Sequence, residues 1–168
     1  LSGADSIANY QQVLRTVTYN NSDQDPNTTA RIITFVVNDG SNNSNTATTT
    51  VTVLGVNDAP LLDLDANDST STGANFAATF TEDAGVVGIA DVDATITDVD
   101  SSNMSSLTVT ITNLLDGTAE SLDADVSGTS IAKSYDSGTG ILTLSGADSI
   151  ANYQQVLRTV TYNNSDQD

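Results

Sequence analysis

The chain has 168 residues, of which 22 are acidic and four are basic, so its formal net charge is −18. This charge excludes nucleic acids and anionic membrane surfaces as partners, because both attract positively charged proteins. Histidine and cysteine are absent, which removes the usual general base, the thiolate nucleophile and the common transition-metal ligands.

A segment near the start of the chain is repeated near its end. Residues 1–25, LSGADSIANYQQVLRTVTYNNSDQD, recur unchanged at 144–168, so Leu1 returns as Leu144 and the period is 143 residues. Similarity at a fixed period is typical of repeat proteins, and this period has the length of a whole domain. We therefore expect the chain to be an excerpt of a tandem array whose ends fall inside a repeat.

Six segments predict β-strands. In each, aliphatic residues alternate with threonine, serine or other polar residues at a period of two, as in a half-buried antiparallel sheet. In chain order they are Arg31–Asn38, Thr46–Leu54, Leu107–Thr112, Thr129–Tyr135, Ile141–Leu144 and Arg158–Tyr162. Their spacing predicts an all-β fold of antiparallel β-sandwich repeats joined end to end.

Two local features complete the predicted elements. Tyr135–Ile141 (YDSGTGI) predicts a hairpin in which Gly138 and Gly140 supply positive φ angles. Asp148–Leu157 (DSIANYQQVL) has apolar residues at helical spacing, with Asp148 or Ser149 placed to cap the first turn. We therefore expect one short crossing helix before the last strand.

The segment Val56–Pro60 (VNDAP) is the expected boundary between domains, because it follows a strand and its proline cannot continue a β-ladder. We expect residues 1–56 to form the C-terminal part of one repeat and 57–60 to be a linker. Residues 61–168 would then form the N-terminal major part of the next repeat. The two strands before the boundary would pair with strands outside their own 61–168.

Acidic clusters make calcium the expected ligand, because Ca²⁺ takes six to eight oxygen ligands. In an extended D-x-D segment, both carboxylates lie on the same side and can share an ion. The alternative is that such pairs are solvated turn residues, and we prefer that interpretation for Asp123 and Asp125. The candidate metal ligands fall into three clusters: Glu82 and Asp83 with Asp98 and Asp100; Asn57 and Asp58 with Asp63 and Asp65; and Asp91 with Asp93.

The order of five motifs carries a resemblance over one whole period. FTEDAG, TDVDSS, NYQQVLRTVTYNN, FVVNDG and a Thr/Val strand ending in VNDAP follow one another around the repeat. This order resembles the cadherin-like and immunoglobulin-like tandem repeats of giant calcium-dependent bacterial surface adhesins. The resemblance implies seven-stranded sandwiches joined end to end, calcium at the junctions and an extracellular spacer that holds an adhesive tip away from the cell. It favours metal binding by Asp98 and Asp100.

Other functions remain open in the sequence. A glycosidase can act through two carboxylates alone, but the chain has no tryptophan to stack on a sugar, and we expect no enzymatic activity. A carbohydrate- or ice-binding module is the alternative function, with Thr46, Thr48, Thr50 and Thr52 as a flat recognition face. The expected partners are calcium and the protein itself, head to tail, through adjacent repeats or neighbouring chains. No apolar run approaches the roughly 20 residues of a membrane helix, so we expect no membrane insertion in this region.

Overall fold

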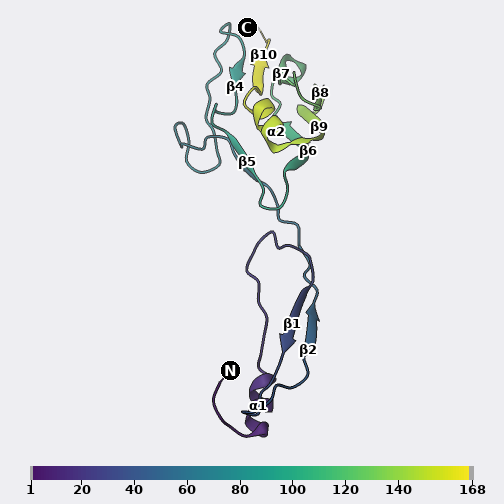
Figure 1. Cartoon of the computed structure of the whole chain (residues 1–168). Helices are drawn as coiled ribbons and strands as arrows, with labels where there is room; N and C mark the ends of the chain where they lie inside the picture. Colours follow the sequence, from purple (N-terminus) through teal and green to yellow (C-terminus); the bar gives the residue numbers. More distant parts are fainter. Residues whose placement is uncertain (1, 167–168) are drawn as a thin grey trace. The chain divides into compact units, whose positions relative to one another are not determined.

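The computed structural model describes residues 2–166. The chain divides into two compact units, Leu1–Val56 and Asn57–Asp168, which we call the N-terminal and C-terminal units (Figure 1). The second unit begins at the first residue of the predicted 57–60 linker.

The N-terminal unit contains one helix and one hairpin. Helix α1 (Ile7–Leu14) is followed by β1 (Arg31–Phe35) and β2 (Ala47–Val51). The two strands pair antiparallel, with Arg31 opposite Val51 and Phe35 opposite Ala47. None of the described residues of this unit is buried, so the unit has secondary structure but no closed core.

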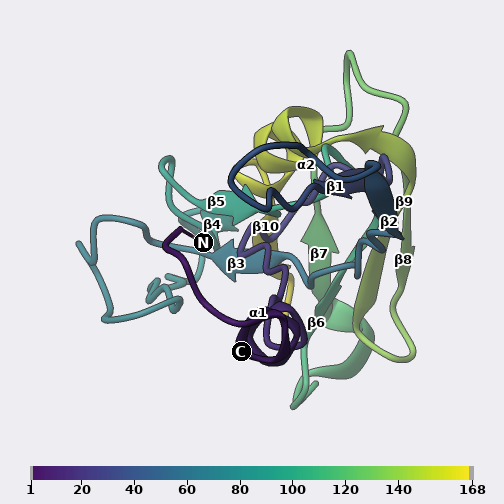
Figure 2. The same ribbon diagram turned by 60° about the horizontal axis from the view of Figure 1, so that its bottom comes forward.

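The C-terminal unit is built from short antiparallel sheets. Strand β9 lies between β6 and β8 in one sheet (Figure 2). Strand β10 lies between β4 and β7 in a second, and β3 pairs with β5. The elements are β3 (Leu61–Asp63), β4 (Val87–Gly88), β5 (Thr95–Thr97), β6 (Asn103–Thr110), a 3-10 turn (Gly117–Ala119), β7 (Glu120–Asp123), β8 (Ala132–Asp136), β9 (Ile141–Ser149), α2 (Ile150–Leu157) and β10 (Thr161–Asn164).

The prediction of a β-rich antiparallel fold is therefore confirmed, and each predicted strand overlaps an observed one. The predicted strand Arg158–Tyr162 began three residues too early. Arg158 caps the end of α2, and the amide of Val160 donates to the carbonyl of Leu157 at 3.1 Å. These bonds hold the chain in a turn until β10 begins at Thr161.

The predicted hairpin joins β8 to β9. Gly140 has φ +68°, and its amide donates to the carbonyl of Asp136 at 2.8 Å. The prediction of a positive φ was wrong for Gly138. The amide of Gly138 instead donates to the Asp136 side chain at 2.9 Å. This hydrogen bond stabilises the turn at the position where a left-handed backbone conformation was expected.

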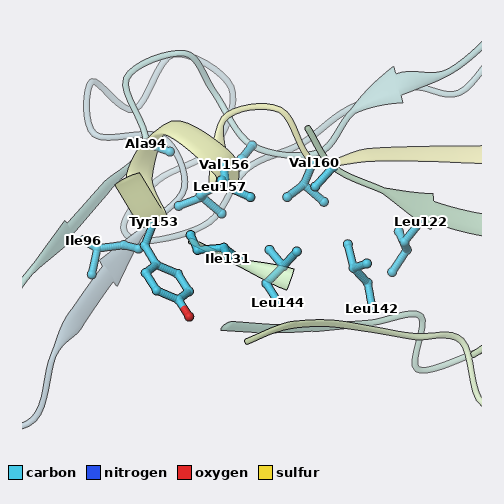
Figure 3. Packing of buried hydrophobic residues seen from close by; sticks show 12 residues of the cluster. Ala94, Ile96, Leu122, Ile131, Leu142, Leu144, Tyr153, Val156, Leu157 and Val160 are labelled. Atoms are coloured by element: carbon cyan, nitrogen blue, oxygen red, sulfur yellow. The ribbon is translucent and has the colours of Figure 1, made fainter. Parts of the chain in front are cut away.

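Helix α2 places its apolar face on the core of the C-terminal unit. Its N-cap is Ser149, whose Oγ accepts the amide of Asn152 at 3.1 Å, while Asp148 accepts the Asn152 side chain at 2.7 Å. Tyr153, Val156 and Leu157 point from the helix toward β9 and its neighbours (Figure 3). The other core residues labelled there are Ala94, Ile96, Leu122, Ile131, Leu142, Leu144 and Val160.

Candidate cation-binding site

Three carboxylates meet beside the β3–β5 pair. Asp65, Asp91 and Asp93 each offer an oxygen atom, and these atoms all lie within 4.8 Å of one another. Because β3 pairs with β5, the residues that follow β3 lie beside those that precede β5. The amide of Asp91 donates to the carbonyl of Leu64 at 2.8 Å, and the amide of Ala66 donates to Asp93 Oδ1 at 3.2 Å. We call this group the acidic triad.

Asp65 is the buried member of the triad, with no exposed surface. Its Oδ1 accepts the amide and the hydroxyl of Ser69, both at 3.0 Å. Its Oδ2 accepts the amide and the hydroxyl of Thr70, both at 2.7 Å, and the amide of Ser71 at 3.2 Å. The Thr70 hydroxyl and the neighbouring donors hold the pKa of Asp65 well below its usual range, against the effect of burial. The loop 66–71 is therefore wrapped around a carboxylate whose charged form it stabilises.

The D-x-D segments among the candidate ligands have a common local structure. The first aspartate accepts the amide of the second in Asp63–Asp65 (3.0 Å), Asp91–Asp93 (3.1 Å) and Asp98–Asp100 (3.1 Å). This side-chain bond to the backbone two residues ahead bends the chain into an Asx turn. The expectation of an extended segment at Asp98–Asp100 was therefore wrong, whereas the turn at Asp91–Asp93 does place both carboxylates in one group. The triad takes one carboxylate from the first pair and both from the second.

Asp98 and Asp100 lie apart from the triad and contact the start of the C-terminal unit. Asp100 Oδ2 accepts the amide of Asp58 at 3.0 Å, while Asp100 Oδ1 is buried and has no hydrogen-bond partner within the described structure. Burial acts to raise the pKa of Asp98, but hydrogen bonds from the amides of Asp100 and Ser101 lower it. The structure thus brings together Asp58 and Asp100, from the predicted second and first clusters.

The remaining predicted ligands do not join a group of three acidic side chains in the described part of the chain. Glu82 and Asp83 are exposed, and Asp83 lies in a turn with φ +61°. Asn57 is exposed and donates its side-chain amide to the carbonyl of Asp58 at 2.6 Å. Asp63 accepts the amide of Asp65, as described above.

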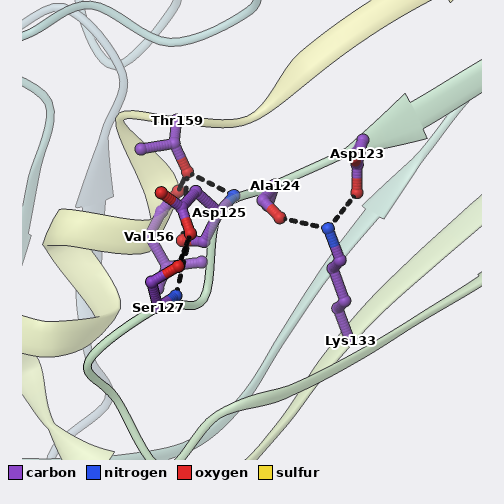
Figure 4. A network of polar contacts seen from close by, with 7 residues as sticks. All are labelled: Asp123, Ala124, Asp125, Ser127, Lys133, Val156 and Thr159. Atoms are coloured by element: carbon purple, nitrogen blue, oxygen red, sulfur yellow. Dashed lines mark hydrogen bonds and ion pairs between the residues drawn. The ribbon is translucent and has the colours of Figure 1, made fainter.

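Asp123 and Asp125 accept hydrogen bonds from other residues of the chain (Figure 4). Asp123 pairs with Lys133 Nζ at 2.5 Å, and this hydrogen bond lowers the pKa of Asp123. Asp125 accepts the hydroxyl of Ser127 and also its amide, the latter at 2.8 Å, and both bonds lower the pKa of Asp125. Asp123 is the last residue of β7, so the preference for turn residues over metal ligands at this pair stays a prediction.

One buried carboxylate was missed. Glu120 is 6% exposed, and its Oε2 has no hydrogen-bond partner within residues 2–166. Its Oε1 accepts the hydroxyl of Tyr162 at 3.1 Å. Glu120 precedes Leu122 by two residues and shares its buried face of β7, so the available signal was an acidic residue at an apolar position of an alternating strand. That strand was not predicted.

The chemistry of the acidic triad suits a hard cation. Its donors are oxygen atoms alone, which Ca²⁺ prefers, and Asp91 and Asp93 are half-buried and open to solvent. Five hydrogen bonds already engage Asp65, so Asp91 and Asp93 would supply most of the free lone pairs to an ion. The three carboxylates together could therefore hold a metal ion.

The chain matches no protein-family model, no curated protein and no solved structure. The resemblance to cadherin-like repeats thus rests on the order of the motifs quoted above.

The two α-helices have eight residues each, and no described helix is long and apolar enough to cross a membrane.

Proposed function

We propose that this chain is part of a structural spacer: immunoglobulin-like or cadherin-like β-sandwich repeats, stiffened by calcium, in an extracellular adhesin or surface filament. The observation that carries the proposal is the unchanged return of 25 residues after 143, in a chain whose described strands form small antiparallel sheets. A repeated domain extends a chain without changing its chemistry, which suits a mechanical role better than an enzymatic one. The net charge of −18 favours cations as ligands.

Calcium is proposed to act at two places in the C-terminal unit. The acidic triad would hold an ion through Asp91 and Asp93, with Asp65 beside them. The second place is the contact between Asp58 and Asp100, where an ion would give the buried Asp100 Oδ1 the partner that it lacks. Because Asp58 belongs to the first residues of the C-terminal unit, an ion there would order the segment that leads into that unit.

The alternative of a carbohydrate- or ice-binding face would use the threonines of β2. Thr48 and Thr50 are exposed, and alternate side chains of a strand point to the same face. Thr49 points to the other face, so threonine is not confined to the row that would bind.

Thermal melting with calcium and with excess chelator tests the proposed ion. A ligand that binds the folded state raises the melting temperature by mass action, so calcium is expected to raise it for the wild-type chain. Asp91→Asn with Asp93→Asn should remove most of this rise. The matched control is Asp123→Asn with Asp125→Asn, which removes two carboxylates at the same spacing and should keep the rise. A melting temperature unchanged by chelation would exclude a calcium-stiffened spacer.

A further inference from the structure

Two carboxylates outside the three predicted clusters flank one turn of the C-terminal unit. The 3-10 turn Gly117–Ala119 begins after Asp116 and ends at Glu120. The amide of Ala119 donates to the carbonyl of Asp116 at 3.2 Å, which closes this turn. Asp116 is exposed, whereas Glu120 is only 6% exposed. The turn therefore holds one carboxylate at the surface and another, four residues later, in the interior.

Strand β10 brings two polar side chains to these carboxylates. Asn164 lies opposite Glu120 in the β10–β7 pair, and Tyr162 lies opposite Leu122. Opposite side chains of an antiparallel pair share a face, and diagonal neighbours are within reach of long side chains. The hydroxyl of Tyr162 donates to Glu120 Oε1 at 3.1 Å, and Asn164 Nδ2 donates to Asp116 Oδ2 at 2.6 Å. We call Asp116, Glu120, Tyr162 and Asn164 the β7–β10 polar cluster.

Both carboxylates of this cluster act on the same oxygen atom. Burial raises the pKa of Tyr162, and the hydrogen bond to Glu120 raises it further. The negative charges of Glu120 and Asp116 act in the same direction, whereas the Asn164 side chain lowers this pKa. The two acids and the asparagine therefore all lie within electrostatic reach of the Tyr162 hydroxyl.

No basic side chain neutralises Glu120. The C-terminal unit has two basic residues. Lys133 pairs with Asp123 at 2.5 Å, and Arg158 Nε donates to the carbonyl of Ala94 at 2.9 Å. Glu120 Oε2 is buried and has no hydrogen-bond partner within residues 2–166. Buried charges in proteins are paired or coordinate metals, so this carboxylate lacks the partner that its position requires.

The missing partner has to be small. Atoms of the described residues already enclose Glu120 Oε2, so another part of a protein chain cannot reach it from the surface. A water molecule would give Oε2 a hydrogen bond but would leave two carboxylates without a countercharge. A metal ion would supply both a bond and positive charge. The oxygen atoms of the cluster belong to carboxylates, an amide and a phenol, and hard cations such as Ca²⁺ prefer oxygen ligands.

We propose that the β7–β10 polar cluster binds a hard divalent cation, at a site separate from the acidic triad. Glu120 Oε2 and the Asp116 carboxylate are its charged ligands, and the ion takes the place of the Asn164 amide at Asp116 Oδ2. Such an ion joins the 3-10 turn to the end of β10 and so stabilises the β7–β10 pair. The inference does not rest on the proposed spacer function, because it uses none of the triad's residues and requires no extracellular location.

Terbium luminescence tests the site, because Tb³⁺ replaces Ca²⁺ at oxygen ligands and emits when a nearby tyrosine absorbs light. All chains in the test carry Asp91→Asn and Asp93→Asn, so that the acidic triad does not contribute. The chain has five tyrosines and no tryptophan. Tyr162→Phe should remove most of the emission that calcium competes away. The matched control is Tyr19→Phe, at the copy of Tyr162 in residues 1–25, which should keep this emission. Equal losses from the two variants, or no emission before either change, would overturn the proposal.

Two carboxylate variants in the same background supply the second measurement. Glu120→Gln and Asp116→Asn should each raise the terbium concentration needed for half-maximal emission, because each removes one charged ligand. Asp116 is exposed, so its variant tests the site even where a change at the buried Glu120 disturbs folding. The control is Asp123→Asn, which removes an exposed carboxylate of the same strand and should leave the titration unchanged. A titration unaffected by Asp116→Asn, or shifted equally by Asp123→Asn, would overturn the proposal.

Discussion

The carbonyl oxygen of Ser130 lies 2.7 Å from the position that a Cβ atom on Gly146 would occupy. An alanine at this position would press its methyl group against backbone, which cannot turn away as a flexible side chain can. We expect Gly146→Ala to destabilise the C-terminal unit by about 1–3 kcal/mol, the usual cost of overpacking. Chemical denaturation followed by circular dichroism would measure the change.

The matched variant is Gly3→Ala. Gly3 and Gly146 have similar positive φ angles, +118° and +126°, so alanine is strained at both, but only Gly146 faces the Ser130 backbone. Gly3→Ala should leave the unfolding of the C-terminal unit unchanged. Equal losses in that unit's stability from the two variants would assign the effect to something other than this contact.

Leu14 and Leu157 offer a second matched pair. Leu157 is 3% exposed, and Leu14 is 45% exposed. Leu157→Ala should cost about 2–5 kcal/mol of the free energy of unfolding, since it leaves a cavity in the core. Leu14→Ala should change it by no more than about 0.5 kcal/mol. Both substitutions have the same neighbours in sequence, so helix propensity contributes equally, and a similar cost at both positions would contradict the observed burial.

The charge of Asp65 should make the stability of the C-terminal unit depend on pH. Its pKa in the folded unit lies below the usual 3.8 because of the donors from Thr70 and Ser69. A carboxylate whose pKa is lowered by folding stabilises the fold at pH values above the pKa that it has in the unfolded chain. This contribution is lost as the pH falls through the pKa of the folded state. Asp65→Asn should therefore lower the melting temperature more at pH 7 than at pH 3.

Asp68→Asn is the control for that comparison. Asp68 is exposed in the same loop and has φ +54°, which asparagine tolerates. It should lower the melting temperature little at either pH. A difference between wild type and Asp65→Asn that is the same at pH 7 and pH 3 would show that the hydrogen bonds do not depend on the charge.

The ion pair between Lys133 and Asp123 should contribute little to stability. The side chains are 38% and 69% exposed, and exposed pairs are typically worth about 0.2–1 kcal/mol. A double-mutant cycle of Lys133→Met and Asp123→Asn should give a coupling energy below about 1 kcal/mol, and salt should reduce it. A larger coupling that is insensitive to salt would mean that Lys133 acts mainly through its second bond, to the carbonyl of Ala124.

The elements that could be predicted are those with a repeated local pattern. The helix α2 followed from apolar spacing and a capping serine, and β8 and β9 from alternation around a glycine turn. Strands β3, β4 and β5 have only two or three residues, too few for a period to be visible. They are strands because they pair with distant residues.

The sequence predicted the residues of the candidate site but not which of them meet. Each carboxylate of the acidic triad was a predicted ligand, but Asp65 was assigned to one cluster and Asp91 and Asp93 to another. Tertiary contacts join them, among them the β3–β5 pair and the hydrogen bond from Ala66 to Asp93. No local pattern in the sequence predicts these contacts. The D-x-D spacing does predict that two aspartates are close in the chain, and in the structure these neighbours form Asx turns.

The identity of residues 1–25 and 144–168 gives the chain an internal reference for solvent exchange. Any proteolytic peptide that falls within both segments has one mass, although its amide hydrogens come from two environments. After exposure to deuterated water, such a peptide should show two isotope envelopes, the heavier from the exposed α1 and the lighter from the buried α2. One spectrum therefore contains both the signal from α2 and its standard from α1.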